Sequence, residues 1–127
     1  MSTNGVVKKI LLVDDDSDIL MMFEAVLSSL GQIISAINGQ EALEVIQRSN
    51  PDLVITDNNM PVMDGAELVR RLRAMGMRIP IIMLSARFCE AIDELREEML
   101  RLDVFCLSKP VDINLLSLTA RQMLHAL

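Results

Sequence analysis

Aromatic residues are nearly absent from this chain of 127 residues, which has no Trp, no Tyr and three Phe. The chain therefore has almost none of the aromatic side chains that are needed to stack on bases or to form an aromatic cage. Basic residues are also few, because twelve Lys and Arg stand against eighteen Asp and Glu, for a formal charge of −6. Nucleic acid is bound through a basic face, so we expect this chain to make no direct contact with it.

Cysteines and long apolar runs are scarce as well. Cys89 and Cys106 are too far apart for a CxxC motif and too few for a disulfide framework, which favours two reduced thiols. The N-terminus lacks the apolar core of a signal peptide, and no apolar run approaches the ~20 residues of a membrane span. We expect a cytoplasmic protein without a membrane partner.

The hydrophobic residues, 51% of the chain, fall into two alternating patterns. Short, almost continuously apolar segments rich in β-branched residues are typical of strands buried on both faces. Segments with helical spacing separate them. The predicted strands are residues 6–13, 33–37, 53–56, 79–84 and 104–107. Five strands alternating with five helices predict a doubly wound α/β fold, with a five-stranded parallel sheet and helices on both faces.

The helix boundaries follow from local signals. An apolar stripe from Ile19 to Leu30 is expected to end at Gly31. Further helices are expected over 38–50 and 64–76, each opened by Asn or Asp with Glu three residues on, and over 112–124 from an Asp cap. In the third helix, Arg70, Arg71 and Arg73 are predicted to face outward. The fourth helix is read from one continuous stripe, made of Phe88, Ile92, Leu95, Met99 and Leu102.

Chemically active side chains follow four of the five predicted strands. Asp14 and Asp15 come after the first, Asp57 after the third, Ser85 after the fourth and Lys109 after the fifth. Ligands of open parallel sheets bind at this edge, where the strand order reverses. Three carboxylates brought together would repel by about 4 kcal/mol per pair at 4 Å and an effective dielectric of 20. An all-oxygen site of this kind suits Mg²⁺.

Phosphoryl transfer is the chemistry that these groups favour. A carboxylate beside Mg²⁺, an ammonium and a hydroxyl can together stabilise the negative charge of a transferring phosphoryl group. Asp57 is the candidate nucleophile, because it ends the predicted central strand and a carboxylate can attack phosphorus. Zn²⁺ is disfavoured, since the lone His125 has no ligand pattern nearby.

Four sequence blocks resemble the receiver domain of two-component response regulators. They are ILLVDDD at 10–16, DNNMPVMDG at 57–65, LSA at 84–86 and KP at 109–110. All four occur in the family's order, each at the end of a predicted strand. The resemblance covers nearly the whole chain and implies a single receiver domain over 1–127, with no effector domain, and a flavodoxin-like strand order of 2-1-3-4-5.

The resemblance also implies roles for individual residues. Asp57 would take a phosphoryl group from a phosphohistidine of a sensor histidine kinase or phosphotransfer protein. Mg²⁺ would be held by Asp15, Asp57 and the backbone carbonyl of Asn59, and Asp14 would bind a water of the metal.

At the neighbouring strand ends, Ser85 would donate a hydrogen bond to a phosphoryl oxygen. Lys109 would contact another oxygen and pair with Asp57 beforehand. The bond between Lys109 and Pro110 is expected to be cis. The output would pass to a downstream protein or an effector domain, through the fourth and fifth helices and the strand between them.

Several positions depart from the family pattern. The family usually has an aromatic ring three residues before the lysine, where this chain has Cys106. Phe105 should point to the opposite face of its strand, so it cannot substitute for that ring. Leu102 and Asp103 replace the usual Gly-Ala. Arg87 is interpreted either as a residue that steers the attacking water or as a solvated charge.

Two other functions stay open at this point. One is a receiver-fold interaction module that works without phosphorylation. Cys106 in place of the aromatic ring favours it, whereas the complete set of Asp14, Asp15, Asp57, Ser85 and Lys109 disfavours it. The other is an Mg²⁺-dependent phosphatase, which the missing Asp-x-Asp pattern after Asp57 disfavours. Because the receiver would catalyse only its own phosphorylation and dephosphorylation, it is predicted to be a signalling protein rather than an enzyme. The oligomeric state is not predicted.

Overall fold

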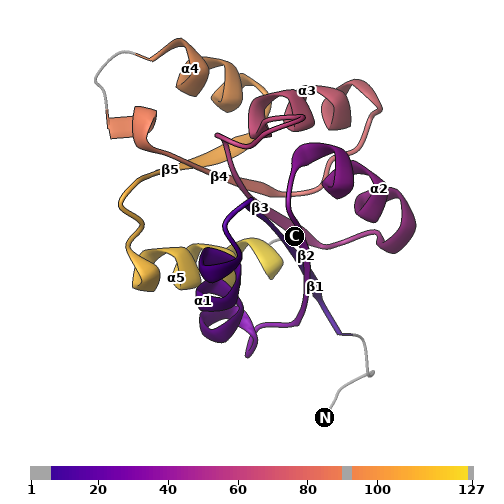
Figure 1. The fold of residues 1–127 in the computed structure, drawn as a ribbon, viewed down its shortest axis with the longest axis vertical. Helices are drawn as coiled ribbons and strands as arrows, with labels where there is room; N and C mark the ends of the chain where they lie inside the picture. Colours follow the sequence, from indigo (N-terminus) through magenta and orange to yellow (C-terminus); the bar gives the residue numbers. More distant parts are fainter. Residues whose placement is uncertain (1–6, 90–92, 126–127) are drawn as a thin grey trace.

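A five-stranded parallel sheet forms the centre of the protein in the computed structural model, which describes residues 7–89 and 93–125 (Figure 1). The strands are β1 (Lys9–Val13), β2 (Gln32–Ala36), β3 (Leu53–Asp57), β4 (Ile81–Ser85) and β5 (Val104–Ser108). Their spatial order is β2-β1-β3-β4-β5, which confirms the predicted fold class and strand order. The order reverses beside β1, and β3 lies between β1 and β4.

Helices cover both faces of this sheet. They are α1 (Ser17–Leu27), α2 (Gly39–Ser49), α3 (Gly65–Ala74), α4 (Glu94–Arg101) and α5 (Ile113–Leu124), with a short 3₁₀ helix, η1 (Ala86–Cys89), after β4. In Figure 1, α1 and α5 lie together on one side and α2, α3 and α4 on the other, and each group encloses its own apolar core. None of the helices found in 7–89 and 93–125 has the length and apolarity of a membrane span.

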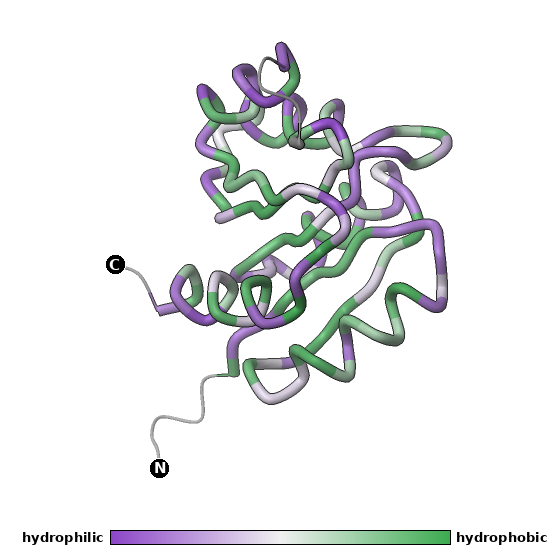
Figure 2. Tube along the Cα trace, turned by 90° about the vertical axis from the view of Figure 1, so that its left-hand side faces the viewer, coloured by the Kyte–Doolittle hydropathy of each residue, from purple (hydrophilic) through white to green (hydrophobic). Residues whose placement is uncertain are grey.

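Buried strands and local capping explain this architecture. Every residue of β3 and β4 is buried, which is why these segments are apolar and β-branched without alternation. Figure 2 shows the hydrophobic residues running through the middle of the fold. Each α-helix begins after an Asp or Asn whose side chain accepts a backbone N–H of the first turn. The predicted caps Asn38, Asp64 and Asp112 are confirmed.

The first and fourth helices differ from their predictions. Helix α1 ends at Leu27, not at Gly31; glycine is needed at 31 because a Cβ there would collide with the Lys8 carbonyl oxygen. The predicted continuous fourth helix is wrong, because Asp93 has an extended backbone (φ −147°, ψ 117°) and caps a separate α4. Phe88 lies in η1 and is buried. It therefore fits the apolar spacing of the predicted helix although it is not part of α4.

Arg73 was expected on the outer face of α3, and this is also wrong. Its guanidinium is partly buried and donates to the carbonyl oxygens of Met77, Ile79 and Leu102 at 2.8–2.9 Å. Burial lowers the pKa of Arg73. These hydrogen bonds connect the end of α3 to the turn that precedes β5. In that turn Asp103 has a positive φ of 60°, which is the left-handed conformation that glycine adopts most readily.

Candidate functional site

Three carboxylates meet at the carboxyl edge of the sheet. Asp57 ends β3, and Asp14 and Asp15 follow β1, which pairs with β3 up to Val13 and Thr56. One carboxylate oxygen from each of the three aspartates lies within 4.8 Å of the others. Asp14 and Asp57 are buried, with 7% and 5% of their surface exposed, whereas Asp15 is exposed. The predicted acidic cluster is therefore assembled, with one member open to solvent.

The electrostatics of the cluster are visible at Asp14. Burial raises the pKa of its carboxyl, and the negative charges of Asp57 and Asp15 raise it further. The Asp16 backbone N–H, which donates to Asp14 Oδ1 at 2.9 Å, and the charge of Lys109 act in the opposite direction. The net pKa is higher than usual, and burial is its largest cause.

Lys109 reaches this cluster from the end of β5. Its ammonium is paired with Asp57 Oδ1, as the resemblance implied. The Lys109 backbone N–H donates to the Ser85 carbonyl oxygen at 3.2 Å, and this bond continues the pairing of β4 with β5. The peptide bond between Lys109 and Pro110 is cis, as expected.

Ser85 supplies the hydroxyl group of the site. It ends β4 and is buried, one strand away from Asp57, which is in register with Leu84. Its Oγ accepts the backbone N–H of Arg87 at 3.2 Å. With an acceptor position engaged there, the hydroxyl keeps its own hydrogen for a further partner.

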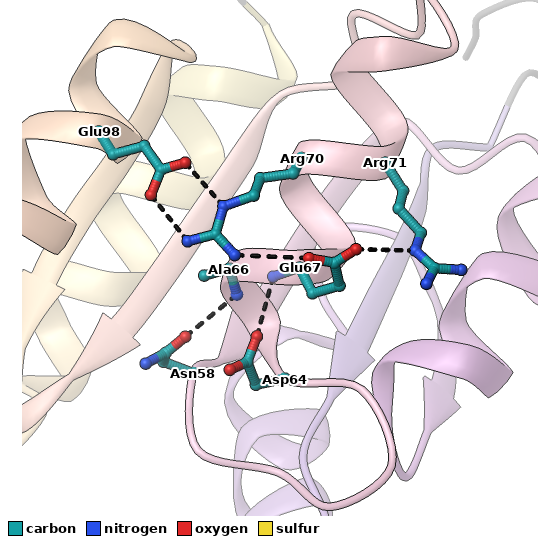
Figure 3. Close-up of polar contacts among 7 residues, drawn as sticks. All are labelled: Asn58, Asp64, Ala66, Glu67, Arg70, Arg71 and Glu98. Atoms are coloured by element: carbon teal, nitrogen blue, oxygen red, sulfur yellow. Dashed lines mark hydrogen bonds and ion pairs between the residues drawn. The ribbon is translucent and has the colours of Figure 1, made fainter.

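The loop after Asp57 is held by residues that the sequence analysis did not single out. The buried Asn58 accepts the Ala66 N–H through its side-chain oxygen at 3.1 Å (Figure 3). Its backbone carbonyl oxygen accepts the Gly65 N–H at 2.9 Å. These bonds fix the start of α3 against the end of β3. Asn58 could have been noticed as a second amide beside Asn59, which is exposed. Its role, however, depends on where α3 packs.

Two predicted departures from the family pattern can be located. Cys106 is partly buried against the core under α2, α3 and α4, whereas Phe105 is 46% exposed and belongs to neither core. The prediction that they occupy opposite faces of β5 is thus confirmed. Arg87 does not lie among the site carboxylates, because its guanidinium binds Asp93, and about half of its side chain is exposed to solvent.

An apolar cleft of about 400 Å³ adjoins the carboxylates, between α1 and the segment that joins β5 to α5. Asp14 and Lys109 form its polar wall, and Met22, Pro110 and Val111 contribute apolar surface.

The residues present fit a magnesium ion. Three carboxylates within 4.8 Å of one another provide only oxygen donors, and their shared negative charge exceeds what Lys109 offsets. Mg²⁺ prefers such donors and keeps several waters, which the exposed Asp15 permits. Soft metals have no thiolate or imidazole ligand in this cluster.

Comparison with known proteins agrees with this geometry. The family described as response regulator receiver domain matches residues 10–121. The chain belongs to this family. The receiver is 42% identical over 88 residues to the transcriptional regulatory protein PrrA of Mycobacterium tuberculosis, covering 68% of this chain and 38% of PrrA. It is 37% identical over 112 residues to the sensor histidine kinase RcsC of Escherichia coli, covering 87% of this chain and 12% of RcsC.

Solved receiver structures have the same fold. The receiver domain of the Francisella response regulator 1452 superposes with a TM-score of 0.83 at 30% identity, covering 92% of this chain and 96% of that one. The chemotaxis protein CheY4 of Vibrio cholerae gives a TM-score of 0.80 at 32% identity, covering 93% and 99%. This receiver thus spans a minor part of PrrA and RcsC but nearly the whole of each of these two chains.

Proposed function

We propose that this receiver accepts a phosphoryl group on Asp57 from a phosphohistidine of a sensor histidine kinase or phosphotransfer protein. The observation that carries the proposal is the grouping of Asp57 with Asp14, Asp15 and the Lys109 ammonium at one edge of the sheet. A signalling role accords with the family. The reaction is confined to the receiver's own phosphorylation and dephosphorylation, and we place it in the cytoplasm.

The ion that we assign to this site is Mg²⁺. Asp15, Asp57 and the Asn59 backbone carbonyl would hold it directly, and Asp14 would hold one of its waters. When bound, Mg²⁺ supplies positive charge that offsets the repulsion between the carboxylates and the incoming phosphoryl group.

The chain's own groups perform the transfer. A carboxylate oxygen of Asp57 forms a bond to phosphorus as the bond from phosphorus to the histidine nitrogen breaks, and the bonding electron pair leaves with the imidazole. The Lys109 ammonium would then contact a phosphoryl oxygen, and the Ser85 hydroxyl would donate to another. In the present structure the Lys109 ammonium is paired with the carboxylate oxygen of Asp57, the proposed nucleophile.

Phosphorylation would act as a switch. A phosphoryl group adds negative charge at a buried position, so it shifts the population between two conformations that differ in their contacts with it. We assign the output surface to α4, β5 and α5. Its partner would be a downstream protein or an effector domain.

Intact-mass spectrometry tests the proposal directly. The protein is incubated with Mg²⁺ and acetyl phosphate, alongside an Asp57→Asn variant and a sample containing EDTA. The expected result is a gain of one phosphoryl group that requires both Mg²⁺ and Asp57. Asp52→Asn is the matched control, since Asp52 precedes the same strand but its carboxylate binds the Lys9 N–H far from the site. If wild-type protein binds Mg²⁺ but gains no mass, the proposal is wrong and an interaction module that works without phosphorylation is favoured.

A further inference from the structure

Asp93 is a buried carboxylate that the phosphorylation site does not use. Its side chain is fully buried, at the start of α4. Oδ1 accepts the backbone N–H of Leu95 at 2.8 Å and that of Arg96 at 3.4 Å, which caps the helix. An ionised group in such a position needs a countercharge or several hydrogen bonds to offset its lost hydration.

Arg87 supplies that countercharge. Its Nε donates to Asp93 Oδ2 at 3.2 Å and its Nη2 to Asp93 Oδ1 at 3.1 Å, a two-point contact that fixes both orientation and distance. The Arg87 side chain itself is half exposed. The ion pair therefore connects η1 to the N-cap of α4 through side chains.

The backbone of the same arginine contacts the phosphorylation site. The Arg87 N–H donates to Ser85 Oγ at 3.2 Å. Arg87 therefore binds the Ser85 hydroxyl through its backbone and the N-cap of α4 through its guanidinium. A second contact reinforces the link, because Arg96 in α4 donates to the Phe88 carbonyl oxygen in η1 at 3.1 Å.

We propose that Arg87 is a positioning residue, whose pairing with Asp93 makes the Ser85 hydroxyl and the first turn of α4 move together when Asp57 is phosphorylated. The inference rests on the proposed function. If Ser85 Oγ turns to donate to a phosphoryl oxygen, the N–H of Arg87 must follow it or lose its acceptor. A guanidinium fixed to Asp93 passes that displacement to α4.

Hydrogen–deuterium exchange of the full chain tests the link, with acetyl phosphate and Mg²⁺ kept present during labelling and the phosphorylated fraction measured on the same samples by intact mass. Asp93→Asn is the sharpest variant, because Asn is also a good helix cap and keeps an oxygen for the Leu95 N–H while losing the charge. Arg87→Ala removes the link from the other side. Arg78→Ala is the control, since Arg78 makes an exposed pair with Asp103 at 4.0 Å.

The expected results distinguish a residue pair that transmits phosphorylation to α4 from one that only stabilises α4. In wild-type protein and in Arg78→Ala, phosphorylation changes the exchange rate of the first turn of α4. In Asp93→Asn that change falls by more than half, although Asp57 is phosphorylated to the same extent. In Arg87→Ala the unphosphorylated α4 exchanges about three- to tenfold faster, because a buried carboxylate has lost its countercharge.

Two results would contradict this inference but leave the proposed function standing. One is a phosphorylated wild-type protein without any change at α4, and the other is a change of wild-type size in both Asp93→Asn and Arg87→Ala. A wild-type protein that gains no phosphoryl group would overturn the proposed function, and this inference with it.

Discussion

Gly65 lies directly against the backbone of Asp57. A Cβ at position 65 would stand 2.5 Å from the Asp57 carbonyl oxygen, closer than real Cβ atoms approach. The contact exists because the first turn of α3 is hydrogen-bonded to Asn58. The position of the proposed phosphoacceptor therefore depends on the absence of a side chain eight residues further along.

Replacing this glycine is expected to disturb both stability and the site. Gly65→Ala forces backbone atoms apart and should lower the free energy of unfolding by about 1–3 kcal/mol. It should also slow phosphorylation by acetyl phosphate, because the end of β3 must shift. Chemical denaturation and intact-mass time courses measure the two effects. Gly76→Asn is the control, because Gly76 has φ +80° with nothing within 4 Å of an added Cβ, and Asn tolerates that conformation. Equal stability of the two variants would contradict the expectation.

The carboxylate cluster predicts a pH dependence at Asp14. Because its pKa is raised in the folded protein, mainly by burial, the folded state holds this proton more tightly than the unfolded chain does. The charged form therefore lowers stability at neutral pH, and this loss disappears as the pH falls through the raised pKa. Asp14→Asn should raise the Tm of the metal-free protein by a few degrees at pH 7, with a difference that shrinks toward the ordinary aspartate pKa of 3.8.

Thermal unfolding in EDTA between pH 4 and 8 checks this dependence. Asn keeps an oxygen for the Asp16 N–H, so the capping contact is preserved in the variant. Asp112→Asn is the control, because that residue is an exposed helix cap and is not a member of the carboxylate cluster. A Tm difference between wild-type protein and Asp14→Asn that is constant over the whole pH range would show that charge is not its cause.

How far the sequence predicts the structure depends on the range of the interactions involved. The capping pairs Asn38 with Glu41 and Asp64 with Glu67 are local, so the starts of α2 and α3 follow from spacing alone. The break before α4 does not, because Phe88 packs into the same core from η1 and keeps the helical spacing of its apolar partners.

The same distinction holds in the candidate site. Asp57 and the other strand-end groups could be located because parallel strands end at one edge of a sheet. The contact of Arg87 with Asp93 could not, since both positions are ordinary charged residues in the sequence. The inward turn of Arg73 is similar, because one of its carbonyl partners, Leu102, is distant in sequence and is brought close only by the fold.

Lys109 and Mg²⁺ are expected to have overlapping electrostatic roles. Lys109→Gln removes positive charge beside three carboxylates and should destabilise the metal-free protein by about 1 kcal/mol, a modest figure because Lys109 is 37% exposed to screening solvent. Mg²⁺ should then bind the variant more tightly than wild-type protein and raise its Tm further, since the ion replaces the missing charge. Titration calorimetry and melts in Mg²⁺ or in NaCl of equal ionic strength measure this. Weaker Mg²⁺ binding by the variant would contradict the argument.

Cys106 should be an unreactive thiol, although it is only partly buried in β5. Burial raises its pKa to about 11 from an ordinary value of 9.0. Since the thiolate is the reactive form, its population at pH 8 falls about hundredfold relative to an unperturbed cysteine. Iodoacetamide should therefore modify Cys106 slowly in the folded protein, at a rate that keeps rising with pH toward 11, and rapidly in urea. Peptide mapping assigns the modified site. If Cys106 is modified as fast in the folded protein at pH 8 as in urea, its thiol is not packed against the core.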